Sequence, residues 1–206
     1  MKIQTRSKTL WMVQTAILAA ILILMAFTPL GYLKVGTISI TFLTLPVVVG
    51  AVLIGPFSGA VLGAVFGITS FAQCFGMDAF GTALMAINPI LTFIMCMVPR
   101  ILMGLLVGLI YRALARFDQK KTWSFAVAAL SGAVINTVLF VGALIWFFGN
   151  SDYLRQFGPN LMAILGVLIT LNAAIEAVVC MIAGTAIVKA LSVADARWTQ
   201  NRKSQE

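Results

Sequence analysis

The sequence predicts an all-α integral membrane protein with six transmembrane helices and both termini in the cytoplasm. Of its 206 residues, 61% are hydrophobic and only 10% are charged, whereas a soluble domain carries roughly 25% charged residues. The apolar segments are much longer than the ~10-residue strands of a membrane barrel, and they lack the strict alternation of such strands. Lysines and arginines gather in alternate connections, which sets the orientation of the helices.

Six apolar runs, separated by glycine, proline or charged residues, are the predicted spans. They are Leu10–Phe27, Ile40–Ile54, Gly59–Gln73, Pro89–Leu114, Trp123–Phe148 and Pro159–Leu191. They form one membrane domain, residues 10–191, between a basic cytoplasmic N-terminus, 1–9, and a polar cytoplasmic tail, 192–206. The first run is long for a signal peptide and lacks a clear cleavage site, so we interpret it as a span.

The fourth segment allows several interpretations. Residues 83–98 and 101–111 can form two half-spans, two spans, or one helix after a partly buried loop. Counting one crossing leaves most of the 14 basic residues in the cytoplasm, whereas two crossings move the 112–121 cluster outward. The cytoplasmic set is then Lys2, Arg6, Lys8, Arg112, Arg116, Lys120, Lys121, Lys189, Arg197, Arg202 and Lys203. We therefore interpret the net charge of +8 as a girdle facing anionic lipid, not as a nucleic-acid surface.

Several chemistries are excluded by what the sequence lacks. It has no histidine, which removes His-based metal sites, Ser-His catalysis and imidazole proton relays. It contains no P-loop, GxSxG or HExxH pattern, and Cys74, Cys96 and Cys180 do not have the spacing of metal ligands. We therefore expect neither an enzyme nor a resident metal or cofactor.

Polar side chains within or beside the spans are the candidate ligand-binding residues. They are Gln73, Asn88, Arg100, Asn136, Asn172 and Glu176. A buried charge costs at least ~2.5–3.5 kcal/mol in a bilayer, so Arg100 needs compensation. The predicted topology places Arg100 where the fourth membrane helix begins on the outer side, and places Asn172 and Glu176 on one face of the sixth span. With Asn136 in the fifth span, these side chains can converge in the outer half of the bundle.

Two interpretations of Arg100 are open at this point. Either it pairs with Glu176 or reaches the outer headgroups, or it binds an anionic ligand such as a carboxylate. The asparagines have a structural alternative too, in hydrogen bonds between helices. The connection 74–88, which contains Asp78, is typical of a lid over a small organic molecule and equally of an interfacial loop. Tyr32 and Lys34 in the first outer loop can close the same site.

Small residues recur at helical spacing in three spans. Glycines stand every four residues over 55–67 and again at Gly104 and Gly108. Residues four apart share a helix face, so these stripes predict close helix packing inside the bundle. Ala16 and Ala20 form the same pattern in the first span.

Several of these segments together resemble one family of membrane proteins. The run ISITFLTLPVVVGAVLIGPFSGAVLGAVFGITSF, followed by INPI and VPRILMGLLVGLIYRAL, resembles the substrate-binding S-components of energy-coupling factor vitamin transporters. So does TAILAAILILMAFTPLG, where Ala16 and Ala20 match the AxxxA motif of that family's first helix. The similarity covers roughly residues 9–190, nearly the whole chain.

The resemblance implies a six-helix subunit of the bacterial plasma membrane that binds one vitamin from outside. Such a subunit docks on a transmembrane coupling protein and two cytoplasmic ATPases, and it is thought to topple in the membrane to deliver the vitamin. The resemblance assigns Ala16 and Ala20 to the interface with the coupling protein. It also implies a vitamin site in the outer half of the bundle, lined by the fourth to sixth helices and covered by the first and third outer loops.

Within this family the sequence looks most similar to members associated with pantothenate. Pantothenate carries a carboxylate, hydroxyls and an amide, which one arginine and several asparagines can satisfy. Aromatic side chains that would stack on a large flat ring are sparse in the last two spans, which disfavours riboflavin and folate. The alternatives are an S-component for one of those two vitamins, a stand-alone proton-coupled transporter using Glu176, and a membrane scaffold with a buried Arg100–Glu176 pair.

Overall fold

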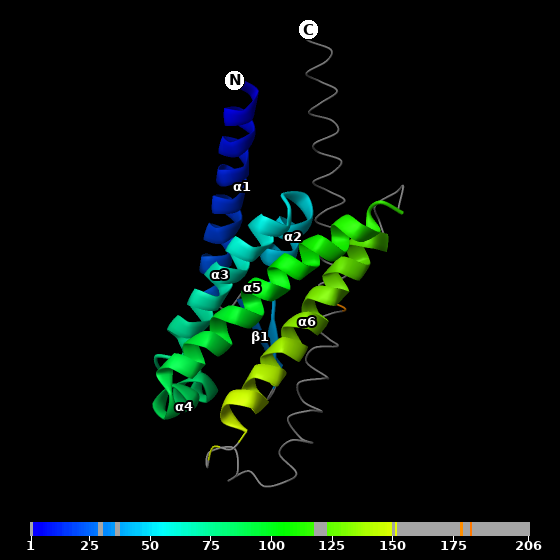
Figure 1. The fold of residues 1–206 in the computed structure, drawn as a ribbon. Coiled ribbons are helices and arrows are strands. Elements are labelled where there is room, and N and C mark those ends of the chain that lie inside the picture. Colours follow the sequence, from blue (N-terminus) through cyan, green and yellow to red (C-terminus); the bar gives the residue numbers. More distant parts are fainter. Residues whose placement is uncertain are drawn as a thin grey trace.

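The computed structural model describes residues 2–28, 31–35, 38–117 and 123–149, and the single residues 151, 178 and 182. The predicted sixth span, 159–191, with Asn172 and Glu176, therefore lies outside the described residues, apart from 178 and 182. The elements in the described part are α1 (Lys2–Ala26), β1 (Tyr32–Val35), β2 (Ile38–Thr41), α2 (Thr44–Leu53), α3 (Pro56–Gln73), α4 (Ala79–Ile87), α5 (Pro89–Leu114) and α6 (Trp123–Phe148). Figure 1 shows their arrangement.

Four of these helices are long and apolar enough to cross a membrane. They contain the stretches Lys8–Ala26, Pro56–Gln73, Pro89–Leu114 and Trp123–Phe148. The helices predicted for the first, third, fourth and fifth spans are thereby confirmed, and the bounds of the last two agree with the prediction. The fourth segment is one continuous helix of 26 residues, as the single-crossing interpretation requires.

The segment before α2 departs from the prediction. Part of the expected loop and the start of the predicted second span form an antiparallel hairpin, in which Tyr32 is opposite Thr41 and Lys34 is opposite Ser39. β-branched residues favour strands, and they are frequent in this segment. The second helix consequently begins only at Thr44 and has 10 residues. At 1.5 Å per residue it is about 15 Å long, so the helix predicted over Ile40–Ile54 begins later and is shorter than the prediction.

The connection 74–88 is not a loop over its whole length, because it contains a short helix. Its second half is α4, a helix of nine residues that begins after Asp78 and ends at Asn88. Both residues have a side chain that accepts hydrogen bonds from the first turn of the helix that follows, as good N-cap residues do.

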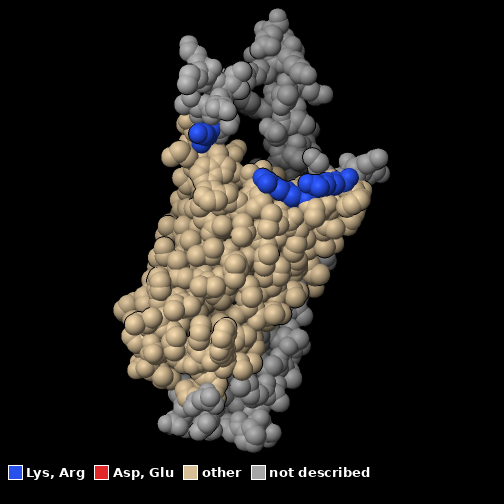
Figure 2. Space-filling model, viewed as in Figure 1, with Lys and Arg blue, Asp and Glu red and all other residues tan. Residues whose placement is uncertain are grey.

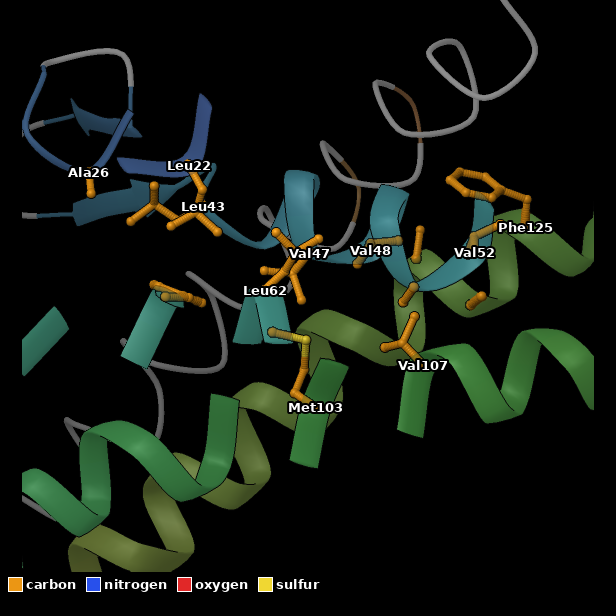
Figure 3. Close-up of a cluster of buried hydrophobic side chains, with 14 residues drawn as sticks. Leu22, Ala26, Leu43, Val47, Val48, Val52, Leu62, Met103, Val107 and Phe125 are labelled. Atoms are coloured by element: carbon orange, nitrogen blue, oxygen red, sulfur yellow. The ribbon is translucent and has the colours of Figure 1, made fainter. Parts of the chain in front are cut away.

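The short helix α2 is the centre of the main hydrophobic core. All its residues from Thr44 to Val52 are buried. Leu22 of α1, Leu62 of α3, Met103 of α5 and Phe125 of α6 pack around it in one cluster (Figure 3). The uniformly apolar sequence of α2 fits this position, since a helix that is hydrophobic on all sides is a buried one.

The helices α3 and α5 run side by side in opposite directions (Figure 1), and their glycines allow the backbones to touch. A Cβ atom added to Gly59 would collide with the carbonyl group of Gly104, and one added to Gly63 would collide with that of Arg100. A Cβ atom on Gly67 would come within 2.9 Å of the Cys96 carbonyl oxygen. The predicted packing of the glycine stripes is confirmed by these contacts.

Basic side chains gather at one end of the described structure, where α1 begins and α5 ends (Figures 1 and 2). The exposed basic residues of α1, α5 and the turn after α5, among those whose side chains are described, are Lys8, Arg112 and Arg116. The short helix α4 lies at the opposite end of the bundle (Figure 1). The charge asymmetry read from the sequence is therefore present between the two ends of the described helices.

Candidate functional site

Arg100 lies in the interior of α5 rather than at its beginning. The helix starts at Pro89, so eleven residues, or about 17 Å of helix, precede Arg100. The prediction that Arg100 begins the fourth membrane helix was wrong, because the helix continues through Pro99 without a break. The side chain is 9% exposed, which makes it a buried cation among apolar helices.

A proline inside the helix provides one partner for this cation. In an α-helix each backbone N–H bonds to the carbonyl oxygen four residues earlier. Pro99 has no N–H, so the Met95 carbonyl cannot receive the bond that this position normally supplies. Nη1 of Arg100 donates to that carbonyl oxygen at 2.9 Å, in a buried setting. The guanidinium therefore satisfies a backbone group that the preceding residue leaves open.

Two phenylalanine rings from neighbouring helices flank the same guanidinium. Its central carbon lies 4.8 Å from the ring centre of Phe140 in α6 and 5.6 Å from that of Phe66 in α3. Both distances are within the roughly 6 Å at which a ring face attracts a cation, and such contacts contribute about 2 kcal/mol or more when desolvated. Arg100 is thus held by residues of three helices.

Asn136 lies on α6 one helical turn before Phe140, so both side chains share a face. Its Oδ1 atom is buried and has no hydrogen-bond partner among the described residues. A buried amide oxygen normally has a donor, and its absence costs about 1–3 kcal/mol. Phe140, one turn away, contacts the guanidinium of Arg100, and the convergence of Asn136 with Arg100 stays a prediction.

A second hydrophobic cluster borders Arg100 on the side of α4. Its buried members are Leu84, Met95, Leu144 and Phe148. Five partly buried side chains pack against them: Phe80, Leu91, Phe140, Ala143 and Phe147. Met95 and Phe140 belong to this cluster and also contact Arg100 through a backbone carbonyl and a ring. The cation therefore faces an apolar region rich in aromatic rings.

Other predicted site residues have local bonds that define their positions. Gln73 donates from Nε2 to the Ala26 carbonyl oxygen at 2.7 Å and so ties the end of α3 to the end of α1. Asp78 accepts a bond from the Gly81 N–H at 2.9 Å. Asn88 accepts bonds from the N–H groups of Ile90 and Leu91, both at 3.1 Å. These contacts give Asp78 and Asn88 a structural role as helix caps.

The remaining predicted ligand-binding residues are described less fully. Tyr32 and Lys34 belong to β1, and only their backbones are described. Asn172 and Glu176 lie outside the described residues. The structure thus places Arg100 against Phe140, one helical turn from Asn136. Gln73, Asp78 and Asn88 have their contacts at helix ends.

Comparison with known proteins identifies the family. A family model described as "ECF transporter, substrate-specific component" matches residues 11–188. The chain belongs to this family. The Pantothenic acid transporter PanT of Lactococcus lactis subsp. cremoris (strain MG1363) is 29% identical over 163 residues, which are 75% of this chain and 78% of that protein. The Pantothenate transporter PanT of Leuconostoc mesenteroides subsp. mesenteroides is 30% identical over 144 residues, which are 65% and 67% of the two chains.

Membership of the ECF substrate-specific components fits the physical character of the chain. The family and its relatives are transporters rather than enzymes. The four long apolar helices of the described part agree with a multi-pass membrane protein.

Sequence reasoning missed three groups around Arg100 in this ECF component. Phe66 and Phe140 are distant in sequence, and only the packing of α3 and α6 against α5 brings them to the guanidinium. The Met95 carbonyl had a local signal, because a proline inside a helix always leaves the carbonyl four residues earlier without its N–H donor. The adjacent Arg100 was an available donor.

Proposed function

We propose that this chain is the high-affinity pantothenate-binding S-component of an energy-coupling factor transporter in a bacterial plasma membrane. It works with a transmembrane coupling protein and two cytoplasmic ATPases that supply the energy. The observation that carries the proposal is the buried guanidinium of Arg100, in a member of a family whose relatives here are named as pantothenate transporters.

Arg100 is the proposed partner of the pantothenate carboxylate. A guanidinium presents five N–H donors in one plane, and pairs of these donors match the two oxygens of a carboxylate. One of the five donors, on Nη1, bonds to the Met95 carbonyl oxygen at 2.9 Å. In an apolar surrounding such a charge pair is stronger than in water, which suits capture of a vitamin present at low concentration.

Polar groups around Arg100 are proposed to bind the rest of the vitamin. The amide of Asn136 suits a ligand hydroxyl or amide N–H, because its buried Oδ1 has no partner among the described residues. Asn172 and Glu176 are proposed to contribute from the sixth span. Five residues are proposed to belong to the segments that cover the site: Tyr32, Lys34, Gln73, Asp78 and Asn88.

Six spans with both termini in the cytoplasm are the proposed topology. It divides the chain into a basic segment 1–9, a membrane domain 10–191 and a tail 192–206. The exposed residues Lys8, Arg112 and Arg116 at one end of the helices support a cytoplasmic position for that end. The end with α4 would then face outward, on the side from which a vitamin arrives.

Ala16 and Ala20 are the proposed contact with the coupling protein. Both are exposed in α1, whereas Thr15, Leu22 and Ala26 of the same helix are buried. Small residues on an exposed helix face allow another helix to approach closely. This pattern supports an interface on the side of α1 that faces away from the described bundle.

Vitamin binding by the purified full-length chain tests the proposal. Native mass spectrometry with pantothenate, riboflavin, folate and biotin, followed by calorimetric titration, should give a 1:1 complex with pantothenate at submicromolar Kd. Binding requires no ATP, whereas sustained uptake into cells requires co-expression of the coupling protein and the ATPases. A complex with another vitamin would overturn the substrate. Uptake that survives loss of the ATPases and stops with an uncoupler would overturn the mechanism in favour of proton coupling.

A further inference from the structure

We infer that Pro99 is a positioning residue for the ligand-binding guanidinium of Arg100, acting through the Met95 carbonyl group. The inference rests on the proposed function, because it assigns to Arg100 the pantothenate carboxylate. It adds a reason for the adjacent placement of a proline and an arginine inside a buried helix. Pro99 itself is buried and need not touch the ligand.

Pro99 changes the backbone hydrogen bonding of α5. A helical residue at position 99 would normally donate its N–H to the carbonyl oxygen of Met95. Pro99 lacks that N–H, and its ring also crowds the same carbonyl, which opens the helix locally. The Met95 carbonyl is thereby exposed to a donor from outside the helical ladder.

Arg100 supplies the hydrogen-bond donor that the Met95 carbonyl oxygen lacks. Side chains in a helix point back toward its N-terminus, so a long side chain at position 100 lies over the turn that contains Met95. Nη1 of Arg100 donates to the Met95 oxygen at 2.9 Å. The charged donor makes the bond about twice as strong as one between neutral groups. The guanidinium is thereby anchored to its own helix.

The packing around Arg100 leaves little conformational freedom to its guanidinium. Phe140 and Phe66 lie against the guanidinium at 4.8 and 5.6 Å from their ring centres. The close approach of Gly63 holds the backbone of Arg100 against α3. An arginine fixed in this way has lost its rotamer freedom before the ligand arrives, so binding does not have to supply that ordering.

Removing the proline should therefore weaken carboxylate binding more than binding of a neutral analogue. In Pro99→Ala the restored N–H bonds to Met95 and closes the local opening, so the guanidinium loses its anchor. We expect the Kd for pantothenate to rise roughly tenfold, the effect of losing one well-placed bond. The Kd for pantothenol, which has a hydroxymethyl group in place of the carboxylate, should change less than about threefold.

Pro89→Ala is the matched control. Pro89 stands in the first turn of the same helix, where no intrahelical N–H bond is missing, so its replacement should leave both Kd values unchanged. In an Arg100→Met background, adding Pro99→Ala should have no further effect on pantothenate binding, because the group that it positions is gone. An equal loss for pantothenate and pantothenol, or an additive loss in the double variant, would overturn the inference.

A measurement without ligand separates this inference from the proposed function. In protein labelled with ¹⁵N-arginine, the guanidinium N–H signals of Arg100 are those absent from Arg100→Met. Their exchange with water should be roughly tenfold faster in Pro99→Ala than in the wild type, because an anchored buried bond protects them. Failure of wild-type protein to bind pantothenate would overturn the proposed function alone. Unchanged exchange in Pro99→Ala would overturn the positioning role alone.

Discussion

The guanidinium carbon of Arg100 lies 4.8 Å from the ring centre of Phe140, so the charge of α5 rests on an aromatic face of α6. The contact joins the buried cation to the second hydrophobic cluster, to which Phe140 also belongs. A ring face is a weak partner compared with a carboxylate, so this contact by itself does not neutralise the positive charge. The contact belongs to the candidate site, in which we propose that Arg100 binds the carboxylate of the vitamin.

Replacing Phe140 should weaken pantothenate binding without removing it. In Phe140→Leu the ring is lost while an apolar side chain remains, so the cation loses an attraction of about 0.5–2 kcal/mol. We expect the Kd for pantothenate to rise by roughly threefold to thirtyfold, measured by titration calorimetry. Phe93→Leu is the control, because Phe93 lies on α5, is partly exposed and contacts Phe71 rather than Arg100. Equal effects of the two variants would remove Phe140 from the site.

Replacing Arg100 itself should abolish tight binding of pantothenate. Arg100→Met keeps most of the side-chain volume but removes the charge, and loss of one partner of a buried charge pair costs about 2–5 kcal/mol. The Kd should therefore rise at least thirtyfold. The Met95 carbonyl loses its donor, yet a buried charge is also removed, so the two effects on unfolding oppose each other. We expect a folded protein by size-exclusion chromatography, and unchanged affinity would exclude Arg100 from the site.

The bounds and packing of the long helices could be predicted from the sequence, whereas the hairpin before α2 could not. The bounds of α5 and α6 follow from long apolar runs between polar residues, and the glycine stripe of α3 predicted its close packing. The hairpin Tyr32–Thr41 was missed because the apolar run of the predicted second span continued into it. A short apolar run is compatible with a buried strand and with a buried helix. Hydrophobicity alone therefore could not show that β2 ends before α2 begins.

The buried cation of the candidate site could be predicted from the sequence, whereas the aromatic rings beside it could not. A lone arginine in an apolar run stands out, because its burial is costly. Phe66 and Phe140 are two of 14 phenylalanines, and nothing in their local sequence distinguishes them from lipid-facing rings. Their role depends on the rotation of α3 and α6 about their axes, which is set by packing against α5.

Adding one methyl group at Gly63 should lower the stability of the protein. A Cβ atom there would collide with the carbonyl of Arg100 and lie 3.1 Å from the Cα atom of Ile101. Both are backbone atoms, so α3 and α5 must separate at the level of the site. We expect Gly63→Ala to lower the thermal unfolding temperature in detergent by several degrees, from overpacking of about 1–3 kcal/mol.

Gly142→Ala is the control for this substitution. A Cβ atom at Gly142 in α6 would meet nothing within 4 Å, and alanine is the better helix former by about 0.5–1 kcal/mol. Its unfolding temperature should be unchanged or higher. If Gly63→Ala behaved like Gly142→Ala, the close contact of α3 and α5 would not exist in the membrane protein.

Labelling from either side of the membrane should separate the two ends of the bundle. Phe117 is 82% exposed beside the basic end, and Met77 is 65% exposed beside α4. In cysteine-free protein in cells, a membrane-impermeant maleimide should label Met77→Cys from outside. It should label Phe117→Cys only after the cells are opened. The reverse pattern would overturn the proposed orientation.

Bulky residues at Ala16 and Ala20 should block assembly and leave vitamin binding intact. Both positions are exposed on α1, so Ala16→Leu with Ala20→Leu adds volume without disturbing the buried side of the helix. That side is fixed by the bond between the hydroxyls of Thr15 and Ser58, at 2.8 Å, and by the contact between the rings of Trp11 and Phe57. Close helix approach needs small residues, so the coupling protein should no longer dock.

Co-purification and binding together distinguish an interface from a structural role. The leucine variant should bind pantothenate with wild-type Kd but fail to co-purify with the coupling protein and ATPases. Ala16→Ser with Ala20→Ser keeps both side chains small, and it should therefore retain the complex. Normal assembly of the leucine variant would exclude this face of α1 as the interface. Loss of binding in the leucine variant would instead give the two alanines a part in the fold of the vitamin site.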